Sequence, residues 1–204
     1  MDRLSELESA RAQTLGMTGA LSQGQLDFAP RTGVWSIGEI LDHLVLAEAL
    51  YRGEIARLIE LARAGRRPYL RRTFDEINVA PMYVPTMLLS LFSTPIAIMS
   101  RTMPDSVRRL LTEFPLVPTR NPDLATPRRH RPAAALQSDL RQSLADTRAL
   151  LATNRDLQFD RMISEHPLTG ATSVPQMLGF LALHERRHQG QIDRVRRQRS
   201  FPAG

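Results

Sequence analysis

The sequence predicts an all-α protein whose four long helices form a bundle, and three observations support this. Apolar residues recur every three or four positions along four separate stretches, which is the spacing of a helix with one buried face. Glycine and proline gather between the stretches. Nothing between them alternates apolar and polar residues as a half-buried strand does. The predicted helices span about residues 4–21, 37–64, 134–152 and 174–199.

The second of these helices has clear start and stop signals. Ser36 and Glu39 have the spacing of a capping box, in which each side chain accepts a hydrogen bond from a backbone N–H of the first turn. Trp35 and Ile40 have the spacing of a hydrophobic staple, which fixes how the chain enters a helix. Gly65 follows the last periodic residue and is typical of a helix end.

The other three helices carry comparable signals. The first runs into Ser22-Gln23-Gly24, where we expect it to end. The third is marked by leucines at helical spacing. The fourth opens with Ser173 and Gln176 as a second capping box, and Pro175 lies in its first turn, where a missing N–H costs nothing.

The connection between the second and third main helices is the least regular part of the chain. At residues 65–132 it is long for a compact domain, so we expect it to hold structure of its own, as short helices near 84–100 and 104–113. Four helices and one long connection predict a four-helix bundle with a crossover. The length suits one domain over residues 1–204, with the connection as an elaboration within it.

An uncharged segment within that connection raises the question of a membrane. Residues 77–100 carry no charged side chain, and about 20 apolar residues can cross a bilayer. Asn78, Pro81, Pro85 and Pro95 interrupt this segment. We therefore expect a lid over the open end of the bundle, or the contact of a homodimer, rather than a membrane segment.

Charge and composition narrow the partners. The net charge is +6, from 27 basic and 21 acidic residues, but every basic residue is arginine, which is more typical of codon bias than of a phosphate-binding face. No nucleic-acid motif is recognisable, so the sequence does not favour nucleic acid as a partner. Without cysteine there is no disulfide and no thiolate ligand. The first residues are polar and acidic, unlike a signal peptide, and we expect a cytoplasmic protein.

The motif with the clearest chemistry is His184-Glu185-Arg186-Arg187-His188, within the fourth helix. His184 and His188 lie one helical turn apart on the apolar side, with the spacing that chelates a divalent metal. The alternative is two core histidines that hydrogen-bond to other protein groups, which requires two large polar rings to find partners in one place. A third ligand would decide between them.

The same five residues match the zinc metalloprotease helix, in which the glutamate is the general base. No histidine follows His188, and Gln191 and Arg194 stand where the extended protease motif requires glycine and histidine. Glu185 also lies about 100° around the helix from His184, at the edge of the apolar side. The context therefore argues against a protease.

Three motifs in order resemble one known family. They are Trp-Ser-Ile-Gly-Glu-x-x-x-His at 35–43, His-Pro-Leu-x-Gly at 166–170 and Leu-x-x-His-Glu-Arg-Arg-His-x-x-Gln at 181–191. Together they resemble the DinB/YfiT-like superfamily, over roughly residues 3–64 and 133–198. The resemblance implies a four-helix bundle that holds one divalent metal ion on three histidines from two helices.

Residue by residue, the family ligands correspond to His43, His184 and His188. Nitrogen ligands suit zinc, nickel, iron or cobalt, and the sequence does not distinguish these. A metal on three neutral ligands acidifies bound water and can also bind a thiol as thiolate. We therefore expect a hydrolase or a transferase that uses a low-molecular-weight thiol, acting on a small-molecule substrate. The alternative is a metal-binding or protein-interaction bundle without catalysis.

Other polar residues near these motifs are weaker candidates. His166, Glu39 and Glu48 could act as an acid or base, and Glu39 could instead orient the nearest histidine ring. His166 precedes a proline in the loop before the fourth helix, where a role in shaping the loop is the alternative. Gln191 lies one turn after His188 and could hold its ring from behind.

Overall fold

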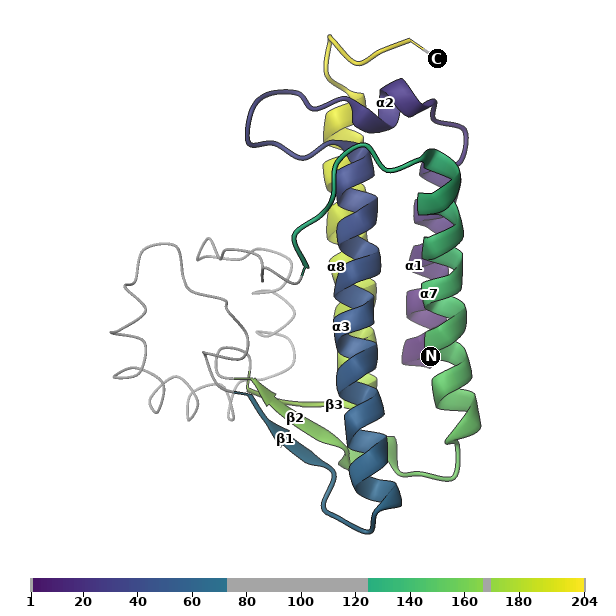
Figure 1. Ribbon diagram of the computed structural model, residues 1–204, viewed down its shortest axis with the longest axis vertical. Helices are drawn as coiled ribbons and strands as arrows, with labels where there is room; N and C mark the ends of the chain where they lie inside the picture. The colour runs from purple at the N-terminus through teal and green to yellow at the C-terminus, as the bar shows by residue number, and fades with distance from the viewer. Residues whose placement is uncertain (1, 73–124, 167–169, 204) are drawn as a thin grey trace, which may run out of the picture.

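The computed structural model describes residues 2–72, 125–166 and 170–203, and in them the chain is mostly helical. Four long helices lie side by side, and a small sheet lies near one end of α3 (Figure 1). These helices are α1 (Arg3–Thr18), α3 (Ile37–Arg63), α7 (Ala133–Thr153) and α8 (Val174–Arg196). The predicted helices are confirmed to within three residues at every end.

Each long helix packs against two others. Helix α1 contacts α7 and α8, and α3 also contacts α7 and α8. The predicted capping box of α3 is confirmed, because the Ser36 hydroxyl accepts from Glu39 N at 3.1 Å and the Glu39 carboxylate accepts from Ser36 N at 2.9 Å. At the start of α8 the Gln176 side chain accepts from Ser173 N at 2.9 Å. Local sequence therefore fixes where both helices begin.

Two apolar clusters fill the space between the helices. One includes Leu7, Leu58 and Met177, near the start of α1 and α8 and the end of α3. The other includes Ile40 and Ile192, from the opposite ends of α3 and α8. Buried polar side chains lie between the two clusters along the helices: Arg11, Thr14, His43, Glu48, Glu185, His188 and Gln189. The middle of the helical assembly is thus a polar layer.

The end of the first helix differs from the prediction. Helix α1 stops at Thr18, and a further short helix, α2 (Gln23–Asp27), follows where we expected only a helix end. Ser22 and Gln25 form a capping box for α2, and this local signal prevails over Gly24. The Gln25 side chain also donates to the carbonyl of Pro202 at 3.1 Å, which ties α2 to the chain after α8.

The prediction that no strand lies between the helices is wrong. Three short strands form one sheet in the order β1-β2-β3, with β1 parallel to β2 and β2 antiparallel to β3. They are β1 (Tyr69–Arg71), β2 (Ile163–His166) and β3 (Gly170–Ser173), and a 3-10 helix, η2 (Phe159–Arg161), precedes β2. Strands of three or four residues are too short to show an alternating pattern.

Some expectations fall on residues that the structure does not describe. The short helices near 84–100 and 104–113, and the uncharged segment 77–100, lie outside the described residues. Among the helices that are described, none combines the length and the apolar character needed to cross a membrane.

Candidate metal centre

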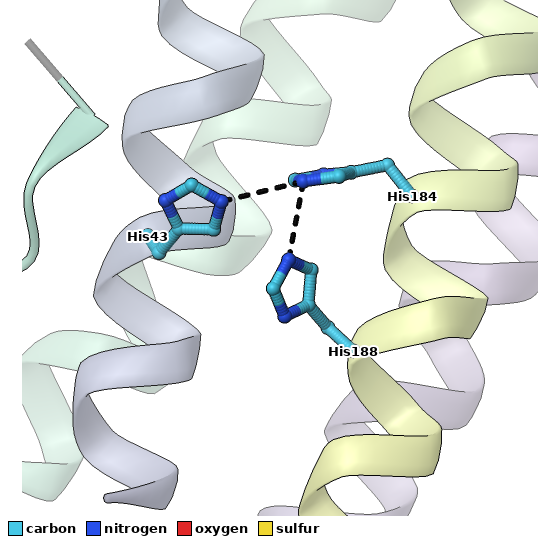
Figure 2. Close-up of side chains that lie close together, drawn as sticks. All are labelled: His43, His184 and His188. Carbon is cyan, nitrogen blue, oxygen red and sulfur yellow. Dashed lines mark hydrogen bonds between the residues drawn. The ribbon is translucent and has the colours of Figure 1, made fainter. Parts of the chain in front are cut away.

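Three histidines meet in the polar layer between α3 and α8. His43 comes from α3, and His184 and His188 come from consecutive turns of α8 (Figure 2). The Nε2 atom of His184 lies 3.3 Å from Nε2 of His43 and 3.1 Å from Nε2 of His188. One nitrogen from each ring lies within 4.8 Å of the other two. The three residues expected as ligands are therefore brought together.

The outer nitrogens of two of these rings are held by fixed acceptors. His43 Nδ1 lies 2.8 Å from the carbonyl oxygen of Ala125, and His188 Nδ1 lies 2.7 Å from Oε1 of Gln191. Carbonyl oxygens can only accept hydrogen bonds, so in both rings Nδ1 carries the proton and donates it. Each neutral ring then has an unprotonated Nε2 with a free lone pair. The predicted contact of Gln191 with His188 is confirmed.

Hydrogen bonds within the triad cannot satisfy these lone pairs. The lone pairs of His43 and His188 both face His184 Nε2, which carries at most one proton. One contact near 3 Å must therefore bring two lone pairs together. A cation that accepts all three Nε2 lone pairs removes this conflict, and nitrogen from three imidazoles is an established donor set for divalent transition metals. The residues present fit such an ion.

The protonation states of the rings agree with that fit. Burial lowers the pKa of His43, and burial together with His188 and His43 lowers the pKa of His184 well below its ordinary value. Burial and the nearby His43 lower the pKa of His188 to about 3. All three rings are thus neutral at pH 7, and metal binding requires neutral imidazole.

Aromatic side chains surround the triad. The ring of Trp35 lies 4.9 Å from that of His43 and is stacked 6.3 Å from that of His188. Phe180 is stacked 5.8 Å from His184, and Tyr51 packs against Phe180 at 5.3 Å. Burial raises the pKa of Tyr51, so its hydroxyl stays protonated. These rings limit water access and keep the dielectric low around the nitrogens.

The carbonyl of Ala125, which accepts from His43, is held near α3 because the residues that follow Ala125 bind to Asp42. Asp42, next to His43 and fully buried, accepts from the backbone N–H of Arg128 at 2.7 Å and from its guanidinium at 3.0 Å. Arg131 donates to the same carboxylate at 2.7 Å. Burial alone would raise the pKa of Asp42, but these hydrogen bonds lower it. Asp42 is therefore a charged anchor for the chain that follows Ala125.

The carboxylates expected as an acid or base have other contacts. Glu39 accepts from Ser36 N and, at 3.0 Å, from Arg129. The ring of His43 is oriented by Ala125 rather than by Glu39. Glu48 is buried and accepts from Arg11 at 2.9 Å and from the Thr147 hydroxyl at 2.7 Å. A catalytic role for either stays a prediction.

His166 lies in β2, where its backbone is paired with Gly170. Its side chain is outside the described residues.

Glu185 and Arg11 form a buried ion pair that sequence reasoning missed. Glu185 is not at the edge of the apolar side but 1% exposed, and both of its oxygens accept from Arg11, at 2.7 and 3.1 Å. Burial raises the pKa of Glu185, although Arg11 opposes the shift. A signal was available, because Arg11 follows buried Leu7 by one helical turn and so falls on the buried face of α1. These contacts give Glu185 a structural partner, unlike a protease general base.

Comparison with known proteins shows the family to which the chain belongs. A family model described as the DinB superfamily matches residues 6–192, a span that contains all three histidines. Searches of curated proteins and of solved structures found no match.

Proposed function

This chain belongs to the DinB superfamily, and we propose that it is a metal-dependent enzyme that holds one divalent ion on His43, His184 and His188. The observation that carries the proposal is the convergence of three Nε2 atoms, because the lone pairs of His43 and His188 cannot both be satisfied by the one proton that His184 Nε2 can carry. Because the chain has no cysteine, it has no thiolate ligand, and imidazole nitrogen is its natural ligand for a divalent transition metal. Zinc, nickel, iron and cobalt all suit three nitrogens.

The wider architecture follows the same proposal. Four long helices that each pack on two others support a four-helix bundle of the DinB kind. Residues 65–132 then form its crossover connection, within one domain over residues 1–204. In such bundles, metal sites are built from side chains on facing helices, as His43 on α3 faces the pair on α8.

The residues around the triad support a reactive site. An ion on three neutral imidazoles would keep its full positive charge and leave positions open, where it would acidify water or a thiol. Ala125 and Gln191 keep a proton on Nδ1 of two rings, so each ring presents its lone pair inward. Trp35 stacks near His188 and Phe180 stacks near His184, and such apolar neighbours would lower the dielectric and strengthen electrostatic interactions at the site.

We propose that the reaction is a hydrolysis or a transfer to a low-molecular-weight thiol, with a small molecule as substrate. Both reactions require a nucleophile that is acidified and held beside a positive centre. The alternative is a metal-binding bundle without catalysis. The near-complete burial of His43 and His188, at 4% and 5% exposed, favours that alternative, whereas the partial exposure of His184 leaves a side from which a substrate could approach.

Metal analysis of the purified protein tests the site. The wild type, loaded in turn with zinc, nickel, iron or cobalt and then dialysed, is expected to retain about one equivalent of metal. His184→Ala should retain almost none, since it removes the nitrogen that lies near both others. His130→Ala is the matched control, because His130 is an exposed histidine that contacts only Asp27 in the described chain. Equal metal content in the wild type and His184→Ala would exclude the site.

Activity assays separate the two functions. The metal-loaded protein should act on at least one member of an ester and amide panel, or transfer a group to a low-molecular-weight thiol. That activity should disappear in the metal-free protein and in His184→Ala. A protein that binds its metal tightly but is inert across both panels would favour the non-catalytic alternative.

A further inference from the structure

Arg11 occupies an unusual place in the polar layer. It is 1% exposed, and its guanidinium donates to Glu185 at 2.7 and 3.1 Å, to Glu48 at 2.9 Å and to the carbonyl of Leu140. Glu48 also accepts from Thr147 on α7. One side chain from α1 thus contacts α3, α7 and α8. We call Arg11, Glu48 and Glu185 the arginine cluster.

The two carboxylates of the arginine cluster come from the two helices that carry the histidines. Glu185 directly follows His184 on α8, and Glu48 lies five residues after His43 on α3. The next turn of α8 repeats the arrangement, because Gln189 follows His188 and donates to the carbonyl of Ala10 at 2.8 Å. Helix α8 therefore presents His184 and His188 to α3. The residues that follow them, Glu185 and Gln189, face α1.

Stability is not the natural explanation for this cluster. Desolvating three charges is costly, and replacing a buried ion cluster by apolar residues of similar volume is often neutral or stabilising. The cluster instead adds hydrogen bonds that depend on direction. Apolar packing tolerates rotation and sliding of a helix, whereas a guanidinium fork accepts two carboxylates only in a narrow geometry. The cluster therefore constrains how α8 is rotated and how far it lies from α3.

We propose that Arg11 is a positioning residue for the metal site. By holding Glu185 of α8 and Glu48 of α3 on one guanidinium, it brings His184 and His188 to His43 at the separation that a single ion requires. The proposal rests on the proposed function, because it assigns Arg11 to the support of that metal site. It predicts that metal affinity depends on the cluster more than stability does.

A triple variant separates geometry from stability. Arg11→Met, Glu48→Leu and Glu185→Leu together remove all three charges and keep the volume. We expect the metal-free triple variant to fold with a midpoint of unfolding at or above that of the wild type. Its zinc affinity, measured by competition with a chelator, should fall about tenfold or more. The visible absorption bands of bound cobalt should shift, since they report ligand geometry. A purely structural cluster would move neither readout.

A second variant and a control complete the test. Arg11→Lys keeps the charge but loses the fork, and should bind zinc more weakly than the wild type while remaining folded. The control removes the solvent-exposed ion pair Arg63–Asp156, by Arg63→Met and Asp156→Leu, and should leave zinc affinity and cobalt spectrum unchanged.

The outcomes distinguish the two proposals. If the wild type binds no metal, the proposed function fails. If the wild type binds metal, and the triple variant or Arg11→Lys binds within twofold with the same cobalt spectrum, only the role of Arg11 is overturned. If neither variant folds, the cluster serves stability and the role of Arg11 is overturned as well.

Discussion

The two polar faces of α8 differ in how their hydrogen bonds balance. On the face toward α1, both oxygens of Glu185 meet donors from Arg11, and the Gln189 amide meets Ala10 and Thr14. On the face toward α3, two acceptor nitrogens point at His184, which has one proton at most to give. Both faces lie in the polar layer at the middle of the helical assembly.

Whether a buried polar cluster needs a ligand depends on the balance between its donors and its acceptors. A cluster in which every charged side chain hydrogen-bonds to a partner is complete without a ligand, and its natural role is to fix helix geometry. A cluster whose acceptors outnumber its donors is incomplete, and burial makes the deficit costly. The natural role of the arginine cluster is therefore to fix the positions of the helices, and that of the histidine triad is to bind an ion.

The largest effect is expected from breaking the complete cluster at one position. Glu185→Leu leaves the guanidinium of Arg11 buried with half of its counter-charge removed, and should cost about 3–5 kcal/mol of folding free energy. His188→Leu in the metal-free protein removes one of the conflicting lone pairs and should change stability by only about 1 kcal/mol. Urea unfolding of both metal-free variants measures the difference. Equal losses would show that the two faces do not differ.

The pH dependence of stability should carry the signature of the triad. An unfolded chain protonates histidine near its ordinary pKa of 6.5, whereas in the folded metal-free chain burial and His43 lower the pKa of His188 to about 3. The unfolded state then binds more protons between these values. Stability should be full above about pH 6.5 and should fall as pH drops toward 3, by about 1.4 kcal/mol per pH unit for this one ring.

Variants identify the source of that slope. In His188→Leu the acid limb should become shallower by about this amount, measured by urea unfolding at a series of pH values. Glu185 works in the opposite direction, because burial raises its pKa and its contribution is lost as pH rises through that raised value. Parallel acid limbs in the wild type and His188→Leu would contradict the lowered pKa.

A smaller effect is expected behind the triad. Gln191→Ala removes the acceptor that keeps the proton of His188 on Nδ1, so metal affinity should fall about 10- to 100-fold. Gln198→Ala is the matched control, because Gln198 lies beyond the end of α8 and donates to the carbonyl of Arg194. Chelator competition with zinc measures both. An affinity of Gln191→Ala equal to that of the control would mean that this hydrogen bond does not orient the ring.

Features of the fold that depend on residues close together in the sequence could be predicted. Helices α3 and α8 were predictable because their capping boxes and apolar spacing are local. The pair His184 and His188 was visible for the same reason, since a four-residue spacing places both on one face. His43 was found through the resemblance to a family.

Features that depend on distant parts of the chain were not predictable. The carbonyl of Ala125 reaches His43 across 82 residues, and any residue type offers a carbonyl. Strand β1 pairs with β2 in register Tyr69 to Ile163, and neither has length enough to show a pattern. The spacing within α1 places Arg11 on the buried face, but it does not reveal that carboxylates from two other helices are its partners.

The smallest effect concerns the cap of α3 and separates stability from binding. Ser36→Ala removes the hydroxyl that accepts from Glu39 N and should cost about 1 kcal/mol of folding free energy. The ring of His43 lies two turns further on and is oriented by Ala125, so zinc affinity of the folded variant should stay within twofold of the wild type. Urea unfolding and chelator competition on the same sample measure both quantities. If affinity fell with stability here, the losses expected for Gln191→Ala and for the arginine cluster could be ascribed to loosening of the helices. If affinity holds, those losses report the geometry of the ligands.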